Sequence, residues 1–228
     1  MKNPVKYLVN RLPRSYLIKI SLVLRYILPL FYWGNKVFCP ICSTSFRKFL
    51  PYGSKWRKNR LCPRCLSLER HRVVWIFLKE KTDFFQVRRN VLHIAPEQCF
   101  YGRFRKLKNL TYLTADLESP LADVKMDIRN MPFADNSFDF IICNHVLEHI
   151  DDDKKAIKEI YRILKKGGYA LLQVPIDRNR KETLEDDSIT DPLEREKLFW
   201  DKEHVRLYGL DYPKRLEQAG FKVVEDNF

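Results

Sequence analysis

From Asn90 onward, short apolar runs alternate with stretches of helical periodicity. The run FDFIICN at 138–144 is almost continuously apolar, as in strands that are buried on both faces of a parallel sheet. A helix is expected over 151–166, because acids occupy its first turn, lysines its last turn, and Gly167-Gly168 follow as a stop signal. The alternation predicts an α/β fold with a doubly wound, Rossmann-like, mostly parallel sheet. The expected strands are 90–95, 110–117, 124–128, 138–144, 169–174 and a sixth that begins within 220–225.

Positive charge is concentrated in the first 90 residues. The chain has 228 residues and a formal net charge of +13. Residues 1–90 contain 20 Lys and Arg against three acids, whereas residues 91–228 contain 22 against 26. A basic segment followed by a nearly neutral one predicts that the first part meets an anionic partner: nucleic acid, an acidic membrane surface or a phosphorylated substrate.

Residues 16–33 form an apolar segment that also carries Lys19, Arg25 and Pro29. A membrane-spanning helix needs about 20 apolar residues with few charges, and no small-residue cleavage site of a secretory signal follows. We therefore expect residues 1–36 to form a basic, apolar helix, for which a position on an anionic membrane surface is physically reasonable. Packing on the protein's own core is the alternative. The expected location is the cytoplasm, peripheral on the inner face of the membrane.

Four of the six cysteines form two Cys-x-x-Cys pairs. Cys39 and Cys42 are separated by 19 residues from Cys62 and Cys65, and each spacing lets two thiolates bind one ion from a tight turn. The pattern predicts a structural Zn²⁺ site in a zinc-ribbon-like module over residues 37–75, with a third domain from 76 to 228. Basic and aromatic residues surround these cysteines, a combination that suits single-stranded or looped nucleic acid. RNA is therefore kept as an alternative partner, less favoured than the membrane surface.

Three segments carry a family resemblance: MPFADNSFD at 131–139, NHVLEHI at 144–150 and IYRILKKGG at 160–168. In this order and spacing they resemble the class I S-adenosylmethionine-dependent methyltransferases of the type 11 branch, over about residues 90–225. HVRLY at 204–208 and LEQAGF at 216–221 look similar to the same branch. The resemblance implies S-adenosyl-L-methionine as cofactor and methyl transfer to a small or lipid-linked acceptor. An RNA methyltransferase guided by the zinc module is the alternative.

The resemblance also implies which residues bind the cofactor, at the carboxyl ends of the strands. Asp116 would accept hydrogen bonds from the ribose hydroxyls, and Asp127 with Ile128 would border the adenine. Asn144 and His145 would face the methionine part and the methyl donor. The alternative for both aspartates is a role in helix capping or in a turn.

The first loop of the cofactor site departs from the family pattern. The usual acid and three glycines are replaced by HIAPEQC at 93–99. His93 stands where the acid is expected, Ala95 is small enough to replace a glycine in part, and Glu97 could reach the cofactor's ammonium group. We expect a divergent loop that still binds the cofactor. A non-catalytic relative that has lost the cofactor is the alternative.

Three histidines are candidates for a catalytic base. His145, His149 and His204 would serve only if the acceptor carries a proton that must leave, and a purely structural role is the alternative for each.

The family's sheet ends in a seventh, antiparallel strand, whereas only Glu225–Phe228 follow Val224. We therefore expect that the chain is a fragment or that another element completes the sheet.

Overall fold

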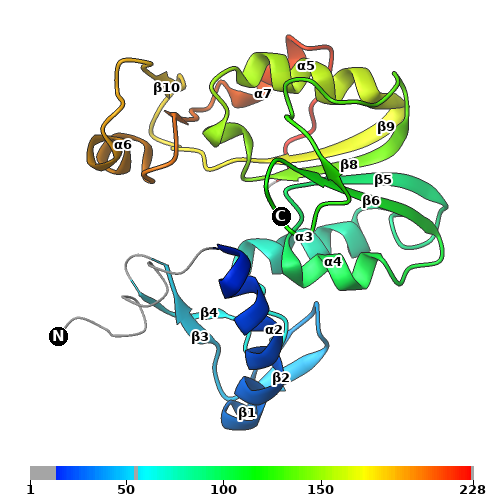
Figure 1. The fold of residues 1–228 in the computed structure, drawn as a ribbon, viewed down its shortest axis with the longest axis vertical. Coiled ribbons are helices and arrows are strands. Elements are labelled where there is room, and N and C mark those ends of the chain that lie inside the picture. The colour runs from blue at the N-terminus through cyan, green and yellow to red at the C-terminus, as the bar shows by residue number, and fades with distance from the viewer. Residues whose placement is uncertain (1–13, 54–55, 227–228) are drawn as a thin grey trace. The chain divides into compact units, whose positions relative to one another are not determined.

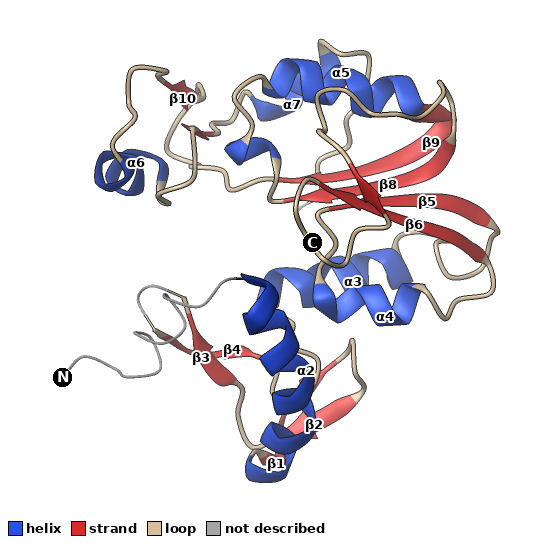
Figure 2. Cartoon of the chain, in the orientation of Figure 1, coloured by secondary structure: helices blue, strands red, loops and turns tan. Residues whose placement is uncertain are grey.

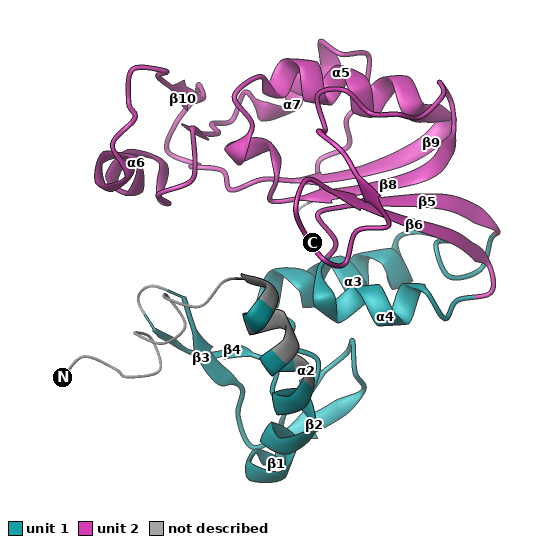
Figure 3. Ribbon diagram, in the orientation of Figure 1, with its two compact units in different colours: residues 1–87, 97–107 teal, residues 88–96, 108–228 magenta. Residues whose placement is uncertain are grey.

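The computed structural model describes residues 14–53 and 56–226, and the chain divides into two compact units. The first unit contains residues 1–87 and 97–107, and the second contains 88–96 and 108–228 (Figure 3). This division differs from the boundary at residue 76 expected from the sequence. The helices α3 (Glu69–Glu80) and α4 (Gln98–Phe104) both belong to the first unit.

The second unit is built on a five-stranded, fully parallel sheet with the order β7-β6-β5-β8-β9 (Figures 1 and 2). Every residue of β8 except Asp139 is buried, which agrees with its almost continuously apolar sequence. Helix α5 (Asp153–Ile163) contributes Ala156, Ile157, Ile160 and Ile163 to the core of the unit. The expectation of a doubly wound, Rossmann-like sheet is confirmed. The strands are β5 (Arg89–Ile94), β6 (Leu110–Asp116), β7 (Val124–Lys125), β8 (Phe138–Asn144) and β9 (Leu164–Gln173).

Two expected elements are wrong at the C-terminal side of the sheet. Helix α5 ends at Ile163, and β9 begins at Leu164, which pairs with Phe138. Gly167 and Gly168 therefore lie inside β9, where the register shifts, and do not end the helix.

The expected sixth strand does not form within the described residues: the segment 221–226 makes no ladder, although Phe221 and Val223 pack against the core.

A long insertion follows β9 and contains β10 (Leu184–Glu185), α6 (Pro192–Phe199) and, beyond it, β11 (Arg206–Leu207). Strands β10 and β11 pair antiparallel, and α7 (Tyr212–Glu217) follows. The Asp191 side chain accepts hydrogen bonds from the backbone N–H groups of Leu193 and Glu194, both at 2.9 Å, so Asp191 caps α6 as the Asp-Pro pair predicts.

The described residues of the first unit form two β-hairpins and three helices. One hairpin pairs β1 (Trp33–Cys39) with β2 (Thr44–Phe46), and the other pairs β3 (Leu50–Tyr52) with β4 (Arg57–Leu61). Helices α3 and α4 pack through aromatic rings: Trp75 lies nearly parallel to Phe100 and Phe104, with interplanar angles of 11° and 7°. These contacts give the physical reason why α3 and α4 belong to the same unit.

Helix α2 (Arg14–Phe31) covers most of the apolar N-terminal segment. The first thirteen residues of the expected basic helix lie outside the described residues. Within the described part of the chain, no helix combines the length and the apolar character that crossing a bilayer requires. Several large apolar side chains of α2 are exposed, among them Tyr26, Leu30 and Phe31.

Candidate functional site

The loop after β5 keeps a left-handed backbone although it contains no glycine. Ala95 has a φ of 50°, and its N–H donates to the carbonyl of Ala115 at the end of β6, at 2.9 Å. Glycine is the usual residue in this conformation, because a Cβ clashes there. Ala95 carries the smallest side chain with a Cβ. The chain therefore retains the turn that a glycine loop would make at the carboxyl end of the sheet.

Asp116, the last residue of β6, stabilises the turn that follows through one carboxylate oxygen, and its other oxygen can accept a further hydrogen bond. Its Oδ1 accepts the backbone N–H groups of Glu118 at 2.8 Å and Ser119 at 2.6 Å. Its Oδ2 accepts no hydrogen bond from the residues described by the structure. The turn fixes the carboxylate in place, and the second oxygen can accept a hydrogen bond from a ribose hydroxyl.

Asp127 and Ile128 have different environments from each other. Two guanidinium nitrogens of Arg129 contact the Asp127 carboxylate, the closest at 2.7 Å, and these hydrogen bonds lower the pKa of Asp127. Ile128 is buried within the core of the second unit. Asp127 is thus engaged with a neighbouring cation, so the expected contact with an adenine amine would compete with that pair.

The two other residues expected in the first loop lie in different settings. His93 is fully buried in β5, and its Nδ1 lies 2.7 Å from the Tyr112 hydroxyl of the neighbouring strand. It therefore takes part in a buried hydrogen bond between strands. Glu97 is the N-cap residue of α4 and belongs to the first unit.

The structure brings the candidate bases together at the end of β8. His145 directly follows β8, with a left-handed φ of 54°, and its Nδ1 lies 3.2 Å from Oε1 of Glu148. The rings of His149 and His204 meet edge to face, with centroids 4.7 Å apart. His149 ends the 3₁₀ helix η1 (Leu147–His149), and His204 precedes β11. Residues 55 positions apart in sequence thus form one cluster with Glu148.

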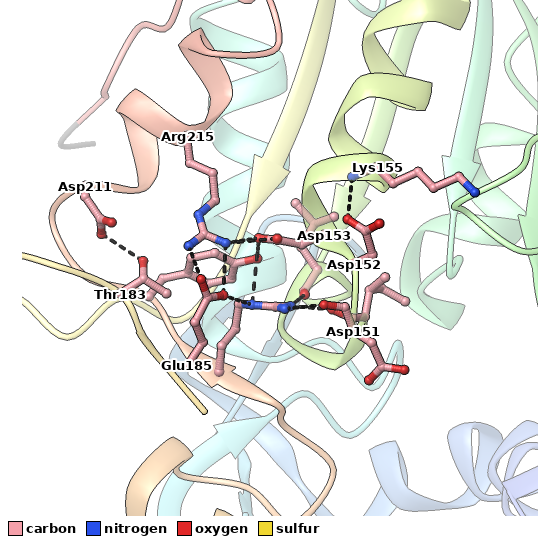
Figure 4. A network of polar contacts seen from close by, with 12 residues as sticks. Asp151, Asp152, Asp153, Lys155, Thr183, Glu185, Asp211 and Arg215 are labelled. Carbon is pink, nitrogen blue, oxygen red and sulfur yellow. Dashed lines mark hydrogen bonds and ion pairs between the residues drawn. The ribbon is translucent and has the colours of Figure 1, made fainter. Parts of the chain in front are cut away.

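A buried ion-pair network that no local sequence pattern predicts supports this edge of the sheet. Arg206, 3% exposed, donates to the carbonyls of Leu147, Ile150 and Asp151. Figure 4 shows Arg215 and Glu185 converging with Asp153, which comes from the first turn of α5. Arg206 lies in the HVRLY segment at 204–208, and its resemblance to the family was the one signal in the sequence that could have pointed to this network. The network fixes η1 against β11.

The four paired cysteines form a compact cluster in the first unit. One sulfur from each of Cys39, Cys42, Cys62 and Cys65 lies within 4.8 Å of all the others. The Sγ atoms of Cys39 and Cys65 are 3.6 Å apart, and those of Cys42 and Cys62 are 3.7 Å apart. This S₄ donor set fits Zn²⁺, which binds four thiolates tetrahedrally in structural sites.

The protonation of these thiols shows why a cation suits the cluster. The pKa of Cys39 is lowered because Cys42, Cys62 and Cys65 donate hydrogen bonds to its sulfur. The pKa values of Cys62 and Cys65 are raised, first of all by their hydrogen bonds to Cys39. Ionisation of all four sulfurs requires a positive charge at the centre, which Zn²⁺ would supply.

The comparisons with known proteins agree with this fold. Residues 92–172 match the family described as "Methyltransferase domain". An uncharacterized protein of Methanocaldococcus jannaschii is 34% identical over 140 residues, which are 57% of this chain and 54% of that protein. The uncharacterized methyltransferase YcgJ of Bacillus subtilis is 36% identical over 77 residues, 34% of this chain and 28% of that protein. The chain therefore spans about half or less of the length of these relatives.

A solved structure shows the same fold at low sequence identity. The [4+2]-cyclase SpnF is 14% identical, with a TM-score of 0.56 over 90% of this chain and 73% of that chain. The parallel sheet and the family match define the class of fold: the second unit has the Rossmann-like fold of class I methyltransferases, and residues 92–172 match the methyltransferase-domain family. No match identifies the acceptor of the methyl group.

Proposed function

We propose that the chain is an S-adenosyl-L-methionine-dependent methyltransferase whose cofactor binds at the carboxyl ends of β5, β6 and β8. The observation that carries this proposal is the left-handed backbone at Ala95, whose N–H extends the pairing of β5 with β6 through its hydrogen bond to Ala115. Strained backbone conformations are concentrated at functional sites, so a strained residue at this position favours a loop that still binds the cofactor. The small Cβ of Ala95 leaves room for the close approach that glycine normally permits.

The chain's own residues would position the cofactor and the acceptor. Asp116 would accept hydrogen bonds from the ribose through Oδ2, and Asn144 with His145 would border the methionine part. When bound, the cofactor supplies a methyl group already activated by its positive sulfur, so that positioning and exclusion of water account for most of the catalysis. His145 is the candidate to accept a proton from an acceptor, because its side chain is 32% exposed and its Nδ1 is held 3.2 Å from Oε1 of Glu148.

Calorimetry with S-adenosyl-L-methionine tests this proposal. The full chain should bind the cofactor, and Asp116→Asn should weaken binding about tenfold or more because the charged acceptor for the ribose is lost. Asp187→Asn, at an exposed acid in the insertion, is the matched control and should bind like the original chain. An absence of binding by the original chain would overturn the proposal and favour a non-catalytic relative of the fold.

We further propose that α2 docks on an anionic membrane surface, where a lipid-linked acceptor would be met. Tyr26, Leu30 and Phe31 are 66–73% exposed, and no acid occurs in the sequence before Glu69. Exposed apolar side chains on a helix within a basic segment fit the interface between lipid headgroups and acyl chains.

Vesicle flotation distinguishes a lipid partner from RNA. The chain should float with vesicles of phosphatidylcholine and phosphatidylglycerol, and the double change Leu30→Ser and Phe31→Ser should abolish flotation. Val224→Ser, at an even more exposed apolar residue of the second unit, is the control and should leave flotation unchanged. Salt-dependent RNA binding that is lost on replacing Arg57, Lys58 and Arg60, without any flotation, would overturn the membrane proposal.

A further inference from the structure

Glu148, His149 and His204 form a cluster of potential metal ligands in the second unit. Each residue offers one ligand atom, and these atoms all lie within 4.8 Å of one another. Glu148 and His149 come from η1, directly after β8, and His204 comes from the segment between α6 and β11. The cluster is separate from the four cysteines, which lie in the first unit.

The hydrogen bonds of the two histidines fix which ring nitrogen can bind an ion. Nδ1 of His149 lies 3.1 Å from the carbonyl oxygen of Glu203, and Nδ1 of His204 lies 2.7 Å from that of Phe199. A carbonyl only accepts, so Nδ1 carries the proton in both rings. Nε2 then holds the free lone pair. A metal-binding imidazole characteristically donates its other N–H to a carbonyl or carboxylate.

Glu148 supplies a buried carboxylate with one unsatisfied oxygen. The residue is 1% exposed, and its Oε1 lies 3.2 Å from Nδ1 of His145. Its Oε2 has no hydrogen-bond partner among the residues described by the structure. Burial of a carboxylate oxygen without a partner is costly, and a cation bound to that oxygen would remove the cost.

The backbone around the cluster is held in place by hydrogen bonds. The N–H of Val205 donates to the carbonyl of Glu148 at 2.9 Å, while His149 bonds to the carbonyl of Glu203 as described above. Arg206 adds hydrogen bonds to the carbonyls of Leu147, Ile150 and Asp151. The two segments that carry the three side chains are thus joined independently of any ligand, which lowers the entropic cost of binding an ion.

We propose that Glu148, His149 and His204 bind a divalent first-row transition-metal ion through Oε2 of Glu148 and Nε2 of each histidine. Two imidazoles and one carboxylate suit Zn²⁺ and also Mn²⁺ or Co²⁺. Three protein ligands leave at least one coordination position open. The proposal needs no methyl transfer and stands apart from the function proposed above.

One consequence does rest on the proposed function. Glu148 and His149 lie a few residues after Asn144 and His145, the residues expected beside the methyl donor. An open coordination position at this edge can bind an oxygen atom of the acceptor, since divalent ions of this kind take oxygen ligands. The ion would then orient the acceptor toward the cofactor.

Metal content after zinc loading and removal of excess zinc tests the site. The original chain should retain a second zinc ion in addition to that of the cysteine cluster. His204→Gln and Glu148→Gln should lose only this second ion, because each removes a ligand. Glu203→Gln is the matched control: it removes a neighbouring, exposed charge, while its backbone carbonyl still accepts from His149.

A Mn²⁺ titration followed by electron paramagnetic resonance gives an independent readout. Thiolate clusters select softer ions, so Mn²⁺ reports on the histidine and carboxylate site alone. Binding should weaken more than tenfold in His204→Gln and His149→Gln and stay unchanged in Glu203→Gln. Circular dichroism checks that each variant is folded, and His149→Gln serves if Glu148→Gln is not.

Two outcomes would overturn the metal site. One is a single zinc ion in the original chain together with an absence of Mn²⁺ binding. The other is a second ion that every variant retains. Neither measurement uses S-adenosyl-L-methionine, so failure of this inference leaves the proposed methyl transfer intact, and failure of cofactor binding leaves the metal site intact.

Discussion

At the scale of single residues, Ala95 adopts a left-handed backbone conformation that is unfavourable for a residue with a Cβ. Its φ of 50° places it in the left-handed region, which costs an L-residue with a Cβ about 1–2 kcal/mol. The surrounding structure maintains this conformation through the hydrogen bond to Ala115. The sequence shows that the glycines are missing, but only the structure shows that the glycine-like turn remains.

We expect Ala95→Gly to stabilise the protein. The change removes the left-handed strain, while the more flexible unfolded chain offsets about 0.4–1 kcal/mol of that gain. The free energy of unfolding should therefore rise by about 0.5–1 kcal/mol, as measured by chemical denaturation. Cofactor affinity should be equal or higher.

The control for this prediction is Ala134→Gly. Ala134 is an exposed loop residue outside the set of positive-φ positions, so the same substitution relieves no strain there. It should lower the free energy of unfolding by a few tenths of a kcal/mol. A loss of stability in Ala95→Gly as large as in Ala134→Gly would show that the turn at Ala95 is unstrained.

Other residue-scale features could not be predicted from sequence. Glu148 is one example, because it is buried beside two histidines. The proximity of His149 and His204 depends on a contact across 55 residues, which no local pattern encodes. The cysteine cluster was predictable because the Cys-x-x-Cys spacing fixes pairs of ligands locally.

At the scale of elements, acidic and basic side chains join α5, β10, β11 and α7. Arg215 of α7 contacts Asp153 of α5 at 2.9 Å and Glu185 of β10 at 2.9 Å. Arg206 of β11 contacts Glu185 at 3.1 Å. Hydrogen bonds from Arg215 and then Arg206 lower the pKa of Glu185 from its ordinary value of 4.5 to about 2, against the opposing effect of burial.

We expect Glu185→Gln to lower stability in a pH-dependent manner. A carboxyl whose folded pKa is depressed stabilises the fold above its unfolded pKa, and this contribution is lost as the pH falls through the folded pKa. The variant should be less stable by about 1 kcal/mol at pH 7, a value reduced because the Glu185 side chain is 37% exposed. The difference should shrink below about pH 4.5 and vanish near pH 2.

Thermal unfolding across this pH range measures the effect. Glu182→Gln, at an exposed acid of the same insertion, should show no such dependence. A stability difference for Glu185→Gln that is constant from pH 7 to pH 2 would contradict the assigned ion pairs.

Element boundaries were predictable where local signals decide them. The strand 138–144 agrees with the sequence expectation, because continuous apolar character acts locally. The Asp191 cap of α6 also follows from a local signal, the Asp-Pro pair. The errors fall where pairing with distant residues decides. Leu164 is not helical because it pairs with Phe138. Gly167 lies in β9 at a register shift, where a glycine looks the same in the sequence as a helix stop signal.

At the scale of the whole molecule, the basic N-terminal part and the nearly neutral sheet differ in what stabilises them. The sheet unit has a large apolar core with contributions from β5, β6, β8, β9 and α5. The cysteine hairpins have short strands of three to seven residues and few buried side chains. A small module of this kind depends on its metal, whose binding supplies about 10–16 kcal/mol in zinc-finger peptides.

We therefore expect zinc removal to unfold the cysteine module selectively. Chelation of the full chain, or Cys62→Ser, should expose the backbone amides of residues 37–65 to hydrogen exchange. Residues 138–144 in β8 should keep their protection, because their core contains no residue of the cysteine cluster. Cys99→Ala removes a buried cysteine outside the cluster and should keep residues 37–65 protected. Equal protection of residues 37–65 with and without zinc would mean that the hairpins fold without the ion, and the cluster would then be no structural metal site.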